Sequence, residues 1–96
     1  MYSIQFLPAA AKELKALPKK AIVEIDTELL ALAKNPRQHS SVTALQGYKG
    51  LFRLRVGDYR VIFKLENRQL LILVVKIGHR KEVYDLLRER IKRLQK

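Results

Sequence analysis

Apolar and polar residues follow recognisable periods along most of the chain, and the period changes where proline or glycine occurs. Residues 2–6 alternate apolar and polar side chains, which predicts a short strand with one buried face. Pro8 fits the first turn of a helix, where the missing N–H costs nothing. Apolar residues then recur at helical spacing on both sides of Pro18, with the longer run from Lys19 to Lys34. The pattern predicts two consecutive helices that form a helical hairpin.

The second half of the chain is dominated by strand patterns. Residues 35–50 have no clear period and are predicted to form a loop. Strands are predicted at 51–56, 59–65 and 70–77, followed by a helix over 82–96 with Val83, Leu87, Ile91 and Leu94 on one stripe. The order β-α-α-β-β-β-α predicts an α+β fold. In this fold the N-terminal helical hairpin packs on one face of an antiparallel sheet and a helix ends the chain.

Gly57-Asp58 separates the first two of these three strands and predicts a two-residue hairpin loop of type II′. Such a loop places Arg55 directly opposite Arg60. Since successive side chains of a strand point to opposite faces, apolar and cationic residues separate. The apolar face comprises Phe52, Leu54, Val56, Tyr59, Val61 and Phe63, and the other face carries Arg53, Arg55, Arg60 and Lys64.

The cationic face predicts an anion-binding site. Like charges directly opposite in a sheet repel, so Arg55 facing Arg60 is costly without a counter-charge. Guanidinium groups that converge match the oxygens of a phosphate. The nearby carboxylates of Asp58 and Glu66 are too few to neutralise four bases. Lys49, in the loop before the first of these strands, is a further cation that could reach a polyanion.

The third strand, LLILVVKI, is apolar on both faces and leads into Gly78-His79-Arg80. If the Glu66–Gln69 turn before this strand places Leu65 opposite Leu70, the segment reaches the hairpin tip. Arg80 would then add a charge to the cationic face, and His79 would add a group that titrates near neutral pH. Tyr84 follows one turn later, where its ring could pack in the core or stack on a nucleic-acid base.

Composition narrows the possible functions. The chain has 96 residues, which favours a single domain over 1–96, and 20 Lys and Arg against nine Asp and Glu give a formal charge of +11. This excess favours a nucleic acid or an acidic protein as partner. The absence of cysteine excludes disulfides and a cysteine nucleophile, and two histidines are too few for an ordinary zinc site. We therefore expect no metal or cofactor.

No segment suggests a membrane partner. The N-terminus lacks the basic region of a signal peptide, and the longest apolar run is far short of the ~20 residues of a membrane span. The sequence therefore predicts a cytoplasmic protein.

The runs GDYRVIF and KIGHRKEVY, together with LQGYKGLFRLRVGDYR, resemble the RelE branch of the RelE/ParE superfamily of type II toxins. The similarity extends over nearly the whole chain. It implies a metal-independent, ribosome-dependent messenger-RNA endonuclease that cuts in the A site and inhibits translation. It also implies an acidic antitoxin that wraps around the toxin, and promoter DNA bound through the toxin–antitoxin complex. In such toxins the RNA 2′-hydroxyl attacks the adjacent phosphate.

The resemblance also assigns roles to residues. Arg53 and Arg55 match the basic strand positions of the family, Arg60 and Arg80 match its transition-state arginines, and Tyr84 matches its base-stacking tyrosine. Lys64 extends the phosphate-binding face. The best-described members carry lysines where this chain has Arg53 and Arg55, and arginine is a poor general base because it stays protonated. His79 and Lys49 are therefore both candidates for the proton-transfer role.

Three alternative functions remain open from the sequence. A ParE-like toxin shares this fold and poisons DNA gyrase by binding it. A nucleic-acid-binding module would bind RNA or DNA in a salt-dependent manner without cleaving it. An inactive toxin would fold and bind its antitoxin only.

Overall fold

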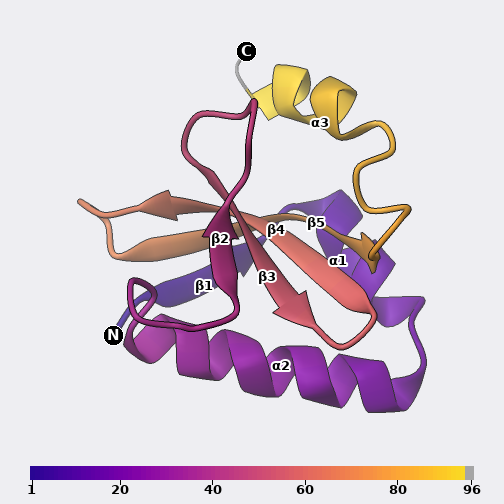
Figure 1. The fold of residues 1–96 in the computed structure, drawn as a ribbon, viewed down its shortest axis with the longest axis horizontal. Helices are drawn as coiled ribbons and strands as arrows, with labels where there is room; N and C mark the ends of the chain where they lie inside the picture. The colour runs from indigo at the N-terminus through magenta and orange to yellow at the C-terminus, as the bar shows by residue number, and fades with distance from the viewer. Residues whose placement is uncertain (95–96) are drawn as a thin grey trace.

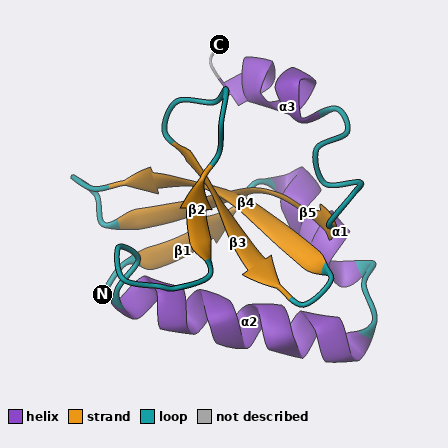
Figure 2. Ribbon diagram, in the orientation of Figure 1, coloured by secondary structure: helices purple, strands orange, loops and turns teal. Residues whose placement is uncertain are grey.

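Five strands form one sheet in the computed structural model, which describes residues 1–94, and helices lie on both faces of the sheet (Figure 1, Figure 2). The strand order is β1-β5-β4-β3-β2, antiparallel throughout except for the parallel pair β1 and β5. The predicted α+β fold is confirmed. The elements are β1 (Ser3–Phe6), α1 (Pro8–Lys15), α2 (Lys19–Lys34), β2 (Val42–Ala44), β3 (Leu51–Val56), β4 (Tyr59–Glu66), β5 (Leu71–His79) and α3 (Leu87–Leu94).

The helical hairpin of α1 and α2 covers the apolar face of the sheet, as predicted. Pro8 is the first residue of α1, and Pro18 immediately precedes α2. Along α2, Ile25, Leu29 and Leu32 lie on one stripe and are buried, because their spacing keeps them on the face toward the sheet. Figure 1 shows α2 running across this face. The main core consists of Ala10, Ile25, Leu29, Leu32, Ala33, Leu54, Val56, Val61, Phe63, Ile72, Val74 and Ile77.

The β3–β4 hairpin has the predicted register, with Arg55 opposite Arg60. Gly57 adopts a φ of +59°, the left-handed value that the first residue of a type II′ turn requires and that side chains with a Cβ rarely adopt. Leu54 and Val61 form a directly opposed pair and are fully buried in the main core. The arginines of the two strands therefore share the other face of the sheet.

A β-bulge between β4 and β5 changes the predicted alignment of β5. The turn after β4 lies one residue later than predicted, at 67–70, because Leu65 pairs with Ile72 and not with Leu70, which has a φ of +49° within the turn. Farther along, the register shifts between Ile62 and Phe63. A shift of one residue moves the following side chains to the opposite face of a sheet. The end of β5 therefore presents the opposite set of side chains from the one predicted.

The segment 35–50 is not a simple loop, which corrects the prediction. It contains the three-residue strand β2, in which Val42 pairs with Leu54 and Ala44 with Phe52. So short a strand gives no readable alternation, and its formation depends on the neighbouring edge of β3. Residues 45–50, between β2 and β3, extend toward α3 (Figure 1).

The C-terminal helix begins later than predicted. α3 starts at Leu87, and Leu86, with a φ of +58°, interrupts any helix that would start at Glu82. The predicted end of this helix, at residues 95–96, lies outside the described residues. The predicted stripe still packs against the arginine face of the sheet, where Leu51, Ile62, Val75, Val83 and Leu87 form a second, smaller core. Within residues 1–94, no helix has the length and apolar character needed to cross a bilayer.

Candidate phosphate-binding site

Two strands and one turn bring cations together at one end of the sheet. Arg55 and Arg60 are a directly opposed pair next to the hairpin turn, and Arg53 lies on the same face, two residues before Arg55. The backbone N–H of Arg80 donates to the carbonyl of Asp58 at 2.8 Å, which fixes the end of β5 to the hairpin tip. We refer to Arg53, Arg55, Arg60 and Arg80 as the arginine cluster.

Arg60 occupies the most constrained position in the arginine cluster. Its Nη1 donates to the carbonyl oxygens of Gly57 and Tyr59, at 2.9 and 2.8 Å, so the guanidinium is held against the turn. Burial, followed by the charge of Arg55, lowers the pKa of Arg60; the charges of Arg53 and Arg80 act in the same direction, and Tyr84 acts against them. The register of β3 with β4 and the hydrogen bond from Arg80 to Asp58 place these groups at one end of the sheet, which agrees with the convergence expected from the sequence.

The arginine cluster has no internal counter-charge. Within residues 1–94, none of its members forms an ion pair with a carboxylate. Like charges held together in this way attract an anion and bind it with several donors. The geometry therefore suits the non-bridging oxygens of a phosphodiester.

Tyr84 borders the arginine cluster. The Nη1 atom of Arg53 donates to the Tyr84 hydroxyl at 2.8 Å, and 36% of the tyrosine is exposed. The preceding residue, Val83, is fully buried and its N–H donates to the carbonyl of His79 at 2.9 Å. Tyr84 therefore lies in a turn whose preceding residue is anchored to β5, and not in a helix, which corrects the prediction. Its exposed ring is available for stacking on a base.

Lys49 and Lys64 lie at the other end of the arginine face. Lys64 pairs with Leu51 across the strands and is four residues from Arg60, or about 13 Å along a strand. Its ammonium forms an ion pair with Glu66 at 2.9 Å. Lys49 and Lys64 border the same cavity beneath α3. They therefore lie apart from the arginine cluster, at the opposite end of the same face.

His79 lies on the face of the sheet opposite the arginine cluster, so the prediction that it joins the arginines is wrong. The bulge places His79 opposite Tyr59, and their rings meet edge to face with centroids 6.1 Å apart. Tyr59 packs against the main core. The same shift places Gly78 opposite Arg60, which leaves Arg80 next to the arginines.

Lys76 is a residue that the sequence reasoning missed. It lies opposite Ile62 on the arginine face, is only 8% exposed, and its Nζ donates to the carbonyl oxygen of Asp85. Burial, and next the charge of Arg90, lower the pKa of Lys76. The signal in the sequence was a single lysine within an otherwise apolar strand. The contact connects β5 to the segment that carries Tyr84.

Comparison with known proteins identifies the family. A family model described as the ParE toxin of the type II toxin–antitoxin system parDE matches residues 4–84. A protein of Escherichia coli described as a RelE-like toxin is 30% identical over 95 residues, which cover 95% of this chain and 98% of that protein. The fold defined above, with cations gathered on one face of the sheet, is that of a type II toxin. The chain belongs to the RelE/ParE superfamily and is RelE-like.

Solved structures agree with this assignment. The archaeal RelE of a RelE–RelB complex from Pyrococcus horikoshii OT3 is 28% identical, with a TM-score of 0.71 over 82% of this chain and 94% of that chain. A mutant of the E. coli toxin RelE in the free state has a TM-score of 0.77 at 22% identity, over 97% of each chain. This second likeness supports the fold alone.

Proposed function

We propose that the protein is a ribosome-dependent messenger-RNA endonuclease that cleaves the codon in the A site and so inhibits translation. The observation that carries this proposal is the arginine cluster, which has no carboxylate partner within residues 1–94 and lies beside the exposed ring of Tyr84. A protein that only binds another protein has no need of such a phosphate site. The enzyme would act in the cytoplasm, where ribosomes translate.

The proposed reaction is an in-line attack of the RNA 2′-oxygen on the adjacent phosphorus. A bond forms between the 2′-oxygen and phosphorus, the bond to the 5′-oxygen breaks, and the products are a 2′,3′-cyclic phosphate and a 5′-hydroxyl. Negative charge grows on the non-bridging oxygens, where fixed cations stabilise the transition state more than the ground state. Arg60, held by two carbonyls next to the turn, and Arg80 supply these cations without a metal ion.

The other members of the site position the RNA. Arg53 and Arg55 hold the flanking phosphate oxygens, and Tyr84 stacks on a base of the codon, so that the scissile phosphate stays at Arg60. Lys64 contacts the backbone farther along the same face. Neither candidate for the proton-transfer role borders the arginine cluster, because His79 lies on the other face of the sheet and Lys49 lies with Lys64 at the far end of the arginine face. A Lys49→Met variant that keeps the wild-type rate and pH dependence of cleavage would exclude Lys49 from proton transfer.

We further propose that an acidic antitoxin binds the chain, and that promoter DNA is bound only through the toxin–antitoxin complex. Relatives support the first part: the P. horikoshii protein is described in complex with RelB, as are the toxins of E. coli and Mycobacterium tuberculosis. The charge of +11 on 96 residues favours an acidic partner.

A cell-free translation reaction with a defined messenger tests the proposed activity. Primer extension should reveal discrete cuts in the A-site codon only when ribosomes are present, and an Arg60→Ala variant should not produce them. Intact messenger together with normal translation would overturn the endonuclease assignment.

A second candidate function is poisoning of DNA gyrase. The match of residues 4–84 to a family model described as the ParE toxin favours it. A supercoiling assay distinguishes the two functions, because a gyrase poison inhibits supercoiling and leaves ribosome-bound messenger uncut. If the protein has neither activity but still binds its antitoxin, it is an inactive toxin.

A further inference from the structure

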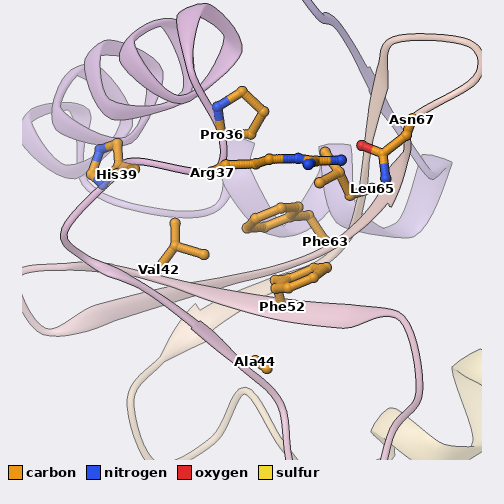
Figure 3. Close-up of a pocket in the computed structure, with 9 residues that line it drawn as sticks. All are labelled: Pro36, Arg37, His39, Val42, Ala44, Phe52, Phe63, Leu65 and Asn67. Carbon is orange, nitrogen blue, oxygen red and sulfur yellow. The ribbon is translucent and has the colours of Figure 1, made fainter.

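A cavity of about 360 Å³ opens on the face of the sheet opposite the arginine cluster, next to the segment that follows α2 (Figure 3). Its size is within the range of pockets that enclose small molecules or protruding side chains. Strand residues form an apolar floor, and the segment between α2 and β2 forms the wall. The residues that matter here are Arg37, Val42, Ala44, Phe52, Phe63 and Leu65.

The floor of the cavity is aromatic. The rings of Phe52 and Phe63 are stacked, with centroids 5.7 Å apart and an interplanar angle of 24°. Phe63 is 1% exposed, whereas Phe52, Val42 and Leu65 are only half-buried. Half-buried apolar side chains around a cavity gain contacts if another apolar group covers them.

One wall of the cavity carries an uncompensated charge. Arg37 is exposed, and Figure 3 shows its side chain extending over the cavity on the side of Phe63 and Leu65. In the described part of the chain Arg37 forms no ion pair and its side chain makes no hydrogen bond. The cavity thus combines an apolar floor with a free guanidinium at its mouth.

The wall is held in place before any partner arrives. Ser41 N–H donates to His39 Nδ1 at 3.2 Å, so the other nitrogen, Nε2, carries the hydrogen and donates to the Glu28 carboxylate at 3.0 Å. This contact fixes the segment after α2 to the helix itself. A preformed pocket binds more tightly because less conformational freedom is lost on association.

We propose that this cavity is an anchor site for the antitoxin, which inserts one large apolar side chain onto the Phe52–Phe63 stack and pairs a neighbouring carboxylate with Arg37. The proposal rests on the antitoxin partnership of the proposed function. Charge complementarity selects this occupant, since a second copy of the chain would bring another +11 to the contact. An acidic segment is instead attracted both by the net positive charge of the whole chain and by the guanidinium of Arg37.

The position of the cavity gives the anchor a distinct role. Phe52 and Phe63 point away from the arginine cluster, because neighbouring residues Arg53 and Lys64 face the other side of the sheet. An antitoxin held here can therefore remain attached while a different part of it covers the phosphate site. Two linked contacts raise the overall affinity through effective concentration.

Binding measurements on the full chain test the anchor. The probe is the purified protein encoded by the gene next to that of this chain, titrated by calorimetry. Arg37→Glu reverses the charge at the mouth, and Ala44→Trp fills the mouth from an exposed position on an edge strand that tolerates a large side chain. Lys20→Glu, an exposed charge reversal in the first turn of α2, is the matched control.

Each pocket variant should weaken binding by about 30-fold or more, the effect of losing one strong interface residue, whereas Lys20→Glu should change it by less than about threefold. All three variants should retain wild-type messenger cleavage, because none alters the arginine cluster.

Wild-type affinity in both pocket variants would overturn the proposal while leaving the endonuclease function standing. If calorimetric dilution shows that the wild-type chain self-associates and that Ala44→Trp does not, the cavity binds a second copy and the proposal is overturned. If the two pocket variants lose affinity and the wild-type chain cuts no messenger, the anchor is supported and the proposed activity is rejected. No binding of the probe to the wild-type chain would overturn the antitoxin partnership and the anchor together.

Discussion

Glu13 of α1 and Arg90 of α3 form a bidentate ion pair, with Nη1–Oε1 and Nη2–Oε2 distances of 2.6 and 3.0 Å. Each residue also bonds to the edge of β5 beyond its pairing with β1: Glu13 accepts from the N–H of Ile77 at 3.1 Å, and Arg90 donates to the carbonyl of Val75 at 3.0 Å. The pair therefore satisfies backbone groups that would otherwise be left at an open sheet edge. It also connects α1 to α3, the helix that follows the turn carrying Tyr84.

Removing one partner of this ion pair should destabilise the protein. Arg90→Met leaves the partly buried Glu13 carboxylate without its cation, and we expect the free energy of unfolding to fall by about 2 kcal/mol. Urea denaturation of Arg90→Met, Glu13→Gln and the double variant measures the coupling between the two side chains. The double variant should lose less than the sum of the two single losses. Strictly additive losses would mean that the two side chains do not interact.

Arg60→Ala should reduce messenger cleavage by about 100- to 1,000-fold, the usual cost of removing one preorganised donor to a developing oxyanion. The effect should fall on the cleavage rate of ribosome-bound messenger more than on binding. Lys64→Ala is the matched control on the same strand and face, because Lys64 already pairs with Glu66 and lies about 13 Å away. Its loss should stay below about tenfold. Equal losses in the two variants would indicate general attraction of RNA and no specific role for Arg60.

Tyr84 can be separated into its ring and its hydroxyl. Tyr84→Phe removes the acceptor for Arg53 and keeps the ring, whereas Tyr84→Ala removes both. If the ring stacks on a base, Tyr84→Phe should retain most of the cleavage activity and Tyr84→Ala should lose about 10- to 100-fold, since one stacked base contributes roughly 1–3 kcal/mol. Single-turnover cleavage of a programmed ribosome provides the measurement. Equal losses in both variants would instead assign the role to the Arg53–Tyr84 hydrogen bond.

Much of the fold was predictable because local patterns decide it. The apolar spacing of α2 predicted its limits and its buried stripe, and Gly57 fixed the register of β3 with β4. The strand β2 was missed because three residues carry no period, and its pairing is decided by the edge of β3. The start of α3 was predicted too early because a stripe of buried residues does not distinguish a helix from a turn interrupted at Leu86.

The site was predictable only where register followed from a short turn. The convergence of Arg53, Arg55 and Arg60 needs only the two-residue loop and the alternation of side chains. The face of His79 depends on a bulge in β5, and a strand that is apolar on both faces carries no alternation by which a bulge could be detected. The burial of Lys76 could not be predicted from the strand pattern either, because it depends on the segment that packs over this lysine.

His79→Gln should cleave messenger almost as well as the wild type. The histidine lies against Tyr59 on the other face of the sheet, so its removal leaves the arginine cluster in place. The rate should therefore fall far less than the about 10²–10⁴-fold expected for a general acid or base. Cleavage rates across a pH range provide the measurement. A loss of that size, together with a changed pH profile, would mean that His79 reaches the RNA in the ribosome-bound form.

Lys76 should make stability depend on pH in the alkaline range. Its pKa in the folded protein is lowered from the usual value of 10.5 by burial and by Arg90, so folding favours the neutral amine. Between the lowered pKa and 10.5 the unfolded chain binds more protons, and the contribution of Lys76 to the free energy of unfolding therefore rises with pH. Below the lowered pKa the penalty for burying the charge is present in full.

Lys76→Met removes the titrating group, so the free energy of unfolding of the wild type minus that of the variant should increase as the pH rises toward 10.5. Urea denaturation of both proteins at several pH values measures this difference. A difference that stays constant would show that the Lys76 amine is as well solvated in the folded protein as in the unfolded chain.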